Sequence, residues 1–182
     1  MKMLKKLLAV VLTGAMALTL LTACGGNAVT EKDIADAMND MAKAAEEDIT
    51  FTPRAKEREL AKAIAALSDE DLKELEESLK HNSLPEKAKE ILEINAGGAN
   101  ETSRFVWCGS VFADEIGTAG QAYNVMNNIL SKDAVNAGKL TGKKPGNIRY
   151  IGTALGTLTI HGKQTTVRFI VVTADAEDPE KT

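Results

Sequence analysis

The stretch that decides the fold reads IRYIGTALGTLTI (148–160), HGKQ (161–164) and TTVRFIVVT (165–173). The two outer runs are rich in Thr, Val and Ile, which favour strands, and the short polar link between them contains a glycine. This pattern predicts an antiparallel β-hairpin. Gly152 and Gly156 predict bulges or a close backbone contact near the start of the first strand. The apolar residues expected to share one face are Leu158, Ile160, Val167, Phe169 and Val171.

Three shorter patterns precede the hairpin. Residues 104–112 hold the densest aromatic cluster of the chain and fit either a buried strand or the edge of a helix. Thr118 and Gln121 have the spacing of a capping box, which predicts a helix that runs to Leu130. Residues 138–146 are rich in glycine and lysine but lack the spacing of a phosphate-binding loop, so we expect a surface loop.

Cys108 lies inside the aromatic cluster. A nucleophilic cysteine needs a lowered pKa and a basic partner, and His161 is the only distant candidate for that partner. His161 itself belongs to the expected hairpin turn, which is a poor place for a buried base. We therefore expect Cys108 to be a buried and unreactive thiol.

Residues 30–95 form an expected helical segment in which four helix starts show capping chemistry. The pairs that mark these starts are Thr30 with Asp33, Thr52 with Pro53, Ser68 with Asp71, and Ser83 with Glu86. Short links predict that consecutive helices fold back on each other. The run Ala-Gly-Gly-Ala-Asn at 96–100 ends this segment, and residues 96–182 form an α+β segment that we expect to share one domain with it.

The expected fold class is therefore α+β. Four N-terminal helices are followed by a further helix and a C-terminal antiparallel hairpin packed as a small sheet. The chain of 182 residues is long enough for one domain with a substantial core.

The N-terminus has the pattern of an export signal. Three lysines within the first six residues precede the uncharged run Leu7–Leu21. Its 15 residues, at about 1.5 Å each, fall short of a bilayer core of about 30 Å. The run ends in Leu21-Thr22-Ala23-Cys24, which resembles the lipobox of bacterial lipoproteins.

This resemblance implies that residues 1–23 are a signal peptide removed before Cys24, and that the Cys24 sulfur carries a diacylglyceryl group. Residues 24–29 would then be the lipidated cysteine and a short tether. The expected location is the cell membrane, lipid-anchored and facing outside the cytoplasm, because two acyl chains suffice for stable anchoring. Cleavage leaves 159 residues with 19 basic and 26 acidic side chains, a balance that argues against a nucleic-acid partner.

Three segments between residues 105 and 174 resemble those of a known family. They are Ala122-Tyr123-Asn124-Val125-Met126-Asn127-Asn128, Tyr150-Ile151-Gly152 and Asp114-Glu115-Ile116. They are similar to segments of the bacterial CAP (SCP-like) domains, which are α-β-α sandwiches. The chain departs from that family where Met126 replaces a tryptophan and Lys132 stands near the place of a histidine, and it has no His-x-x-x-Glu pair. The metal-binding cavity of the family would therefore be missing, and we predict no metal site.

Two classes of function remain open. The first is a non-enzymatic binding or interaction domain at the cell envelope, which would contact an envelope protein or a cell-wall ligand. The alternative is an envelope hydrolase that uses a carboxylate pair, Glu115 with Asp114 or Asp133, or a degenerate CAP-like domain. No cofactor is expected. The candidate residues for a polar site are Asp114, Glu115 and His161.

Overall fold

The computed structural model describes residues 29–113 and 116–179 and shows an α+β fold. The helices are α2 (Glu31–Ala44), α3 (Ala55–Ala65), α4 (Asp69–Lys80), α5 (Glu86–Ile91) and α6 (Thr118–Asn124). A π-helical turn, η1 (Val125–Ile129), continues α6, and a 3₁₀ turn, η2 (Ala137–Lys139), precedes the hairpin. The strands are β1 (Thr50–Pro53), β2 (Arg104–Phe112), β3 (Lys144–Ile160) and β4 (Lys163–Glu177). None of the described helices is long and apolar enough to cross a membrane.

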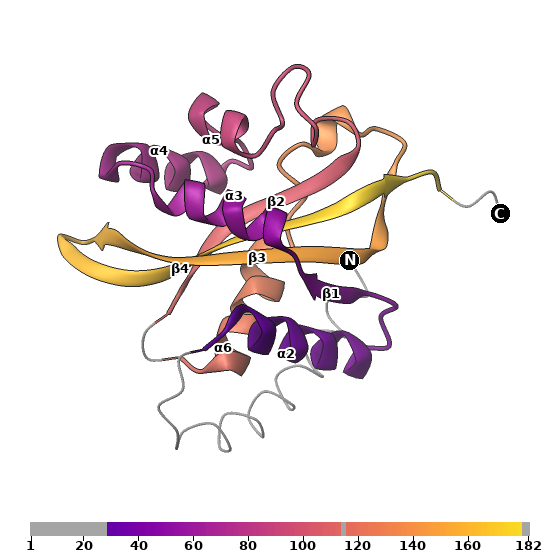
Figure 1. Ribbon diagram of the computed structural model, residues 1–182, viewed down its shortest axis with the longest axis horizontal. Coiled ribbons are helices and arrows are strands. Elements are labelled where there is room, and N and C mark those ends of the chain that lie inside the picture. The colour runs from indigo at the N-terminus through magenta and orange to yellow at the C-terminus, as the bar shows by residue number, and fades with distance from the viewer. Residues whose placement is uncertain (1–28, 114–115, 180–182) are drawn as a thin grey trace.

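The four strands form one mixed sheet in the order β1-β3-β4-β2. β4 pairs antiparallel with both β3 and β2, whereas β1 pairs parallel with β3. Helices cover both faces of the sheet (Figure 1): α3, α4 and α5 lie on one face, and α2 and α6 lie on the other. The described residues therefore form three layers with a core on each side of the sheet.

The predicted hairpin is confirmed and is longer than expected. The turn has only two residues, His161 and Gly162, with φ angles of 50° and 76°. Two successive positive φ angles are typical of the type I′ turn, whose twist matches that of the strands it joins. The strands extend beyond the predicted runs, to Lys144 at one end and Glu177 at the other.

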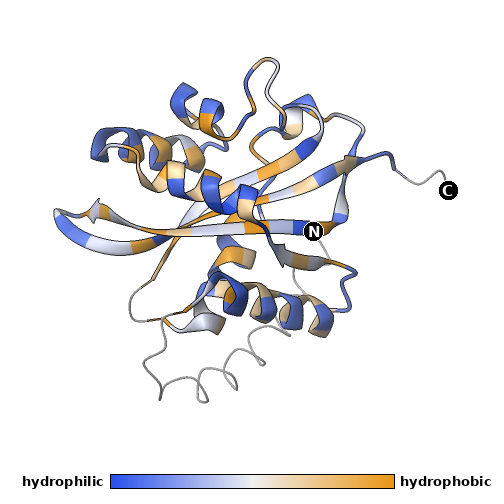
Figure 2. Cartoon of the chain, in the orientation of Figure 1, coloured by the Kyte–Doolittle hydropathy of each residue, from blue (hydrophilic) through white to orange (hydrophobic). Residues whose placement is uncertain are grey.

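The two faces of the hairpin belong to two different cores. The five residues predicted to share a face do so, beneath α3, α4 and α5. The opposite face contributes Ile151, Ile170 and Val172 to the core under α2 and α6, together with Phe51 and Trp107 from the neighbouring strands. Figure 2 colours the ribbon by hydropathy, and hydrophobic and hydrophilic positions alternate along the helices.

Helices form at four of the five predicted starts, and two of these starts have the predicted side-chain cap. Thr30 and Ser68 accept hydrogen bonds from the backbone of Asp33 and Asp71, as their spacing predicts. In contrast, α5 and α6 begin without a side-chain cap, after Pro85 and Gly117. Ser83 instead donates its hydroxyl to the Ser78 carbonyl at the end of α4.

The one wrong start is that at Thr52 and Pro53, which lie in β1 and do not begin a helix. Phe51 is buried in the core under α2, and this burial holds the segment in the sheet. Proline is tolerated there because β1 is an edge strand. The prediction that four helices precede the first strand is therefore wrong, because β1 lies between α2 and α3, and the sheet that contains the predicted hairpin also has a parallel pair of strands. Residues 104–112 are a strand, which decides between the two readings of the aromatic cluster.

Helix α3 touches the backbone of β3 at Gly152. A Cβ atom at this position would overlap the carbonyl carbon of Glu57 and the backbone nitrogen of Arg58. The close backbone contact predicted for Gly152 is thus confirmed, whereas Gly156 lies against the ring of Phe169. The register irregularity of β3 lies elsewhere, between Pro145 and Arg149.

We expect the substitution Gly152→Ala to destabilise the protein by at least about 3 kcal/mol, because α3 would have to move off the sheet. Urea unfolding followed by circular dichroism measures this loss. The matched control is Gly138→Ala, where an added Cβ meets no atom within 4 Å and the stability should change by less than about 0.5 kcal/mol. Equal stability of the two variants would contradict the described packing of α3.

Candidate functional site

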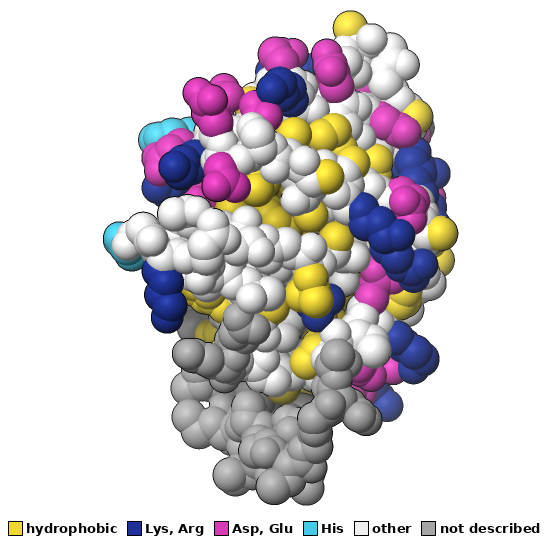
Figure 3. Space-filling model, turned by 60° about the vertical axis from the view of Figure 1, so that its left-hand side comes forward, with side chains coloured by type: hydrophobic (Ala, Val, Ile, Leu, Met, Phe, Trp, Pro, Cys, Tyr) yellow, Lys and Arg dark blue, Asp and Glu magenta, His cyan; other side chains and the backbone are white. Residues whose placement is uncertain are grey.

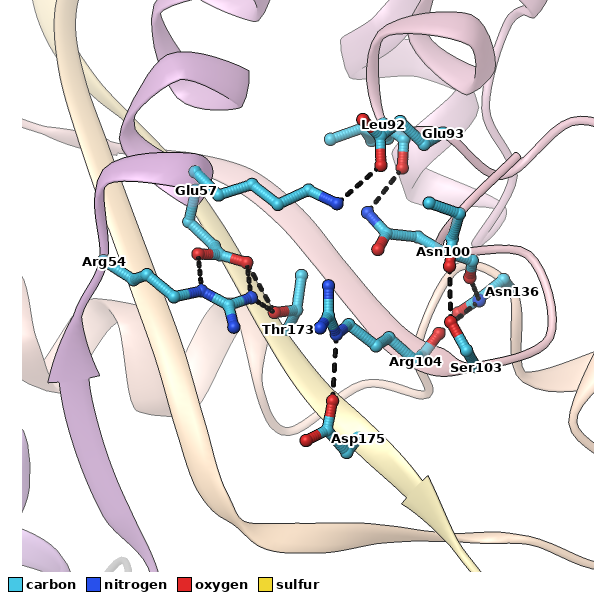
Figure 4. A network of polar contacts seen from close by, with 12 residues as sticks. Arg54, Glu57, Leu92, Glu93, Asn100, Ser103, Arg104, Asn136, Thr173 and Asp175 are labelled. Carbon is cyan, nitrogen blue, oxygen red and sulfur yellow. Dashed lines mark hydrogen bonds and ion pairs between the residues drawn. The ribbon is translucent and has the colours of Figure 1, made fainter.

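The interior of the protein contains a buried charge pair at the contact between α3 and the sheet. The Glu57 side chain has no exposed surface, and it accepts hydrogen bonds from Arg54 and from the Thr173 hydroxyl, the latter at 2.8 Å (Figure 4). The Arg54 guanidinium also lies 3.6 Å from the centre of the Tyr150 ring. Burial by itself raises the pKa of the Glu57 carboxyl, but the hydrogen bonds from Arg54 and Thr173 outweigh it and the pKa is lowered. Both charges are satisfied, so the pair has a structural role.

Arg168 is a second buried arginine, and each of its three side-chain nitrogens donates a hydrogen bond. It donates to the Gln121 side chain of α6 at 2.9 Å, to the Thr153 hydroxyl at 3.2 Å and to the Val29 carbonyl at 2.7 Å. These bonds tie α6 and the first described residue to the centre of the sheet. Gln121, which the sequence suggested as part of a capping box, serves this network instead.

Arg149 of β3 differs from the other two arginines. Among the described residues its side chain has no hydrogen-bond or ion-pair partner, and its Nη1 atom is buried. The guanidinium lies 5.1 Å from the centre of the Trp107 ring. Burial lowers the pKa of the Arg149 guanidinium to about 10, and the charge of Glu177 offsets only part of this effect. Arg149 is half-buried, and its buried Nη1 atom lacks a hydrogen-bond acceptor that a ligand could supply. The surroundings of Arg149 are therefore the candidate functional site.

Arg149 lines a pocket of about 140 Å³ between α2 and η1 on one side and the sheet on the other, which we call the Arg149 pocket. Its remaining lining residues are Ala42, Glu47, Ile49, Phe51, Trp107, Met126, Leu130 and Ser131. Most of this wall is apolar, and the indole nitrogen of Trp107 is already bonded to the Lys132 carbonyl at 3.0 Å. For comparison, an apolar cavity of about 150 Å³ holds one benzene molecule. The pocket therefore suits a compact apolar group next to one acceptor for Arg149.

Two irregular elements shape the Arg149 pocket. The register shift in β3 ends at Arg149, and bulges of this kind re-aim side chains near functional sites. The π-helical turn η1 contributes Met126 to the wall, and such turns are also frequent at functional sites. Gly109 of β2 permits η1 to approach the sheet, because a Cβ there would lie 2.9 Å from the Ile129 side chain.

A larger hollow of about 530 Å³ lies between α4, β2 and the tip of the hairpin. His161 and Asp133 are among its lining residues, and Figure 3 shows both histidines of the chain protruding at one edge of the molecule. His161 is exposed in the hairpin turn, as predicted. Cys108 also lines this hollow, but the side chain is buried and burial raises the pKa of its thiol to about 12. The prediction of a buried thiol is confirmed, and the raised pKa disfavours the reactive thiolate.

The remaining sequence-predicted residues lie outside the described part of the chain. These are Leu21, Thr22, Ala23 and Cys24 of the lipobox-like segment, and Asp114 and Glu115 of the proposed carboxylate pair. In the part that is described, the carboxylates with a shifted pKa all titrate lower than usual, which is the opposite of what a catalytic acid requires. No three of its His, Cys, Asp and Glu side chains gather in a group that could hold a metal ion. These observations give the hydrolase hypothesis no support.

Comparisons with protein-family models, with curated proteins and with solved structures found no match for this chain. Sequence reasoning did not identify Arg149 as a site residue. The available signal was its position two residues before Ile151, which places a charged side chain on the same face of the strand as a core residue.

We expect Glu57→Gln to destabilise the protein by about 2–3 kcal/mol at pH 7, because Arg54 loses its ionic partner inside the fold. Since the folded pKa of Glu57 is lowered, this stabilisation is complete above the usual value of 4.5 and is lost as the pH falls below it. Urea unfolding between pH 7 and pH 3 should show that the difference in the free energy of unfolding between wild type and variant decreases in acid. The exposed residue Glu59 on the same helix provides the control, since Glu59→Gln should cost less than about 0.5 kcal/mol. A difference that stays constant across this pH range would contradict the assignment of Glu57 as the ionic partner of Arg54.

Proposed function

We propose that this protein is a lipid-anchored extracytoplasmic domain of the bacterial cell membrane that binds a ligand in the Arg149 pocket. The observation that carries the proposal is the Arg149 guanidinium, which is desolvated, unpaired and placed beside the face of Trp107. Arg54 and Arg168 show that this fold does supply partners to buried arginines. The lack of such partners at Arg149 lowers the stability of the free protein, and it leaves the N–H groups of the guanidinium available to a ligand.

The proposed anchor rests on the Leu21–Cys24 segment and agrees with how the chain enters the fold. The Val29 carbonyl is bonded to Arg168, so the path from Cys24 to a fixed point of the domain is five residues long. Five extended residues span at most about 18 Å. The domain would therefore stand close to the outer surface of the membrane, where it can meet an envelope protein or a ligand from outside the cell.

The anchor is tested by mass spectrometry of protein extracted from the membrane fraction. The expected N-terminal peptide begins at Cys24 and carries a diacylglyceryl group, whereas Cys24→Ala carries no lipid. The matched control is Cys108→Ala, which removes the other cysteine of the chain and should keep the lipid. An unmodified Cys24 thiol in the extracted wild-type protein would refute the anchor.

A further inference from the structure

The Arg149 pocket contains a second unpaired charge. Glu47 lies on the loop between α2 and β1, is half-buried, and has no side-chain partner among the described residues. It forms no ion pair with Arg149, although both side chains line the same small pocket. The pocket thus offers one free cation and one free anion that are separated from each other. A ligand that carries one charge of each sign can satisfy both.

The apolar wall and the volume of the pocket set the size of the ligand. Trp107, Met126 and Leu130 present apolar surface, and Trp107 is only 7% exposed. A volume of about 140 Å³ accepts one branched or aromatic group of benzene size. Sugars and nucleotides are larger and need many more polar partners than this wall supplies.

The charges define the ionic groups of the ligand. A guanidinium matches a carboxylate in a planar, two-bond arrangement, and it binds more strongly when water is excluded. A doubly charged phosphate is disfavoured, because the loop beside the pocket carries three successive acidic residues, Glu46, Glu47 and Asp48. The Glu47 carboxylate in turn suits an ammonium group at the pocket wall.

We propose that the ligand of this pocket is a single free apolar amino acid. Its carboxylate binds Arg149, its ammonium group faces Glu47, and its side chain packs on Trp107, Met126 and Leu130. This inference deepens the proposed function and rests on the Arg149 pocket being the binding site, but it does not require the lipid anchor.

The test uses the full chain reconstituted in phospholipid vesicles, with leucine as the probe. Trp107 is the only tryptophan of the chain, so its fluorescence reports directly on the pocket, and calorimetry gives the affinity. N-acetyl-leucine keeps the carboxylate and lacks the ammonium group, as does the last residue of a peptide. Leucinamide keeps the ammonium group and lacks the carboxylate, as does the first residue of a peptide. We expect leucine to bind more tightly than either analogue.

Two variants separate the contributions of the two charges. Arg149→Met should weaken leucine binding by at least about 30-fold, because it removes a desolvated ionic hydrogen bond. Glu47→Gln should weaken leucine binding by about three- to fivefold and leave N-acetyl-leucine binding unchanged, since Glu47 is partly exposed. The control is Arg104→Gln, which removes a guanidinium paired with Asp175 outside the pocket and should bind leucine as the wild type does.

The outcomes distinguish this inference from the proposed function. If N-acetyl-leucine binds as tightly as leucine and depends equally on Arg149, the pocket is a carboxylate site and the assignment to free amino acids is overturned. If none of the three probes changes the Trp107 fluorescence up to millimolar concentrations, the inference also fails, whatever the lipid analysis shows for Cys24. Leucine binding that survives Arg149→Met would overturn both the inference and the choice of site.

Discussion

The contact of α3 with β3 at Gly152 is the constraint on which the other elements depend. Because Gly152 has no side chain, the backbone of α3 at Glu57 lies directly on the sheet, and the Glu57 carboxylate is buried there. Arg54 and Thr173 neutralise that charge, and the Arg54 backbone N–H also bonds to the Ile151 carbonyl at the end of β1. This contact thus positions α3, the edge strand β1, and β3, which carries Arg149.

Arg54, Arg149 and Arg168 differ in their partners, and this difference separates structure from proposed function. Arg54 and Arg168 are surrounded by acceptors, and their networks join segments that are far apart in the sequence. Arg149 is half-buried, with a buried Nη1 atom, and faces the ring of Trp107 and an apolar wall. A partly buried cation without a hydrogen-bond or ion-pair partner lowers the stability of the free protein, and selection tolerates such a cost most readily where a ligand removes it.

Local patterns predicted much of the fold. The Thr- and Val-rich runs and their glycine link determined the hairpin and its faces, and Thr30 and Ser68 determined two helix starts, because these effects act within a few residues. β1 was missed because its four residues, with Pro53 among them, resemble a helix start, and their pairing is with residues about 100 positions later. The Arg149 pocket was missed for the same reason, since β1, β2, β3 and η1 meet there only in three dimensions.

The most direct test of this account is the stability of Arg149→Met in the absence of any ligand. Methionine keeps an unbranched apolar stem and needs no hydrogen-bond acceptor, so it retains part of the packing without the charge. If Arg149 is unpaired and kept for binding, urea unfolding should show the variant to be more stable than the wild type by about 1–2 kcal/mol. A loss of stability of that size would mean that Arg149 supports the fold, and would contradict the account.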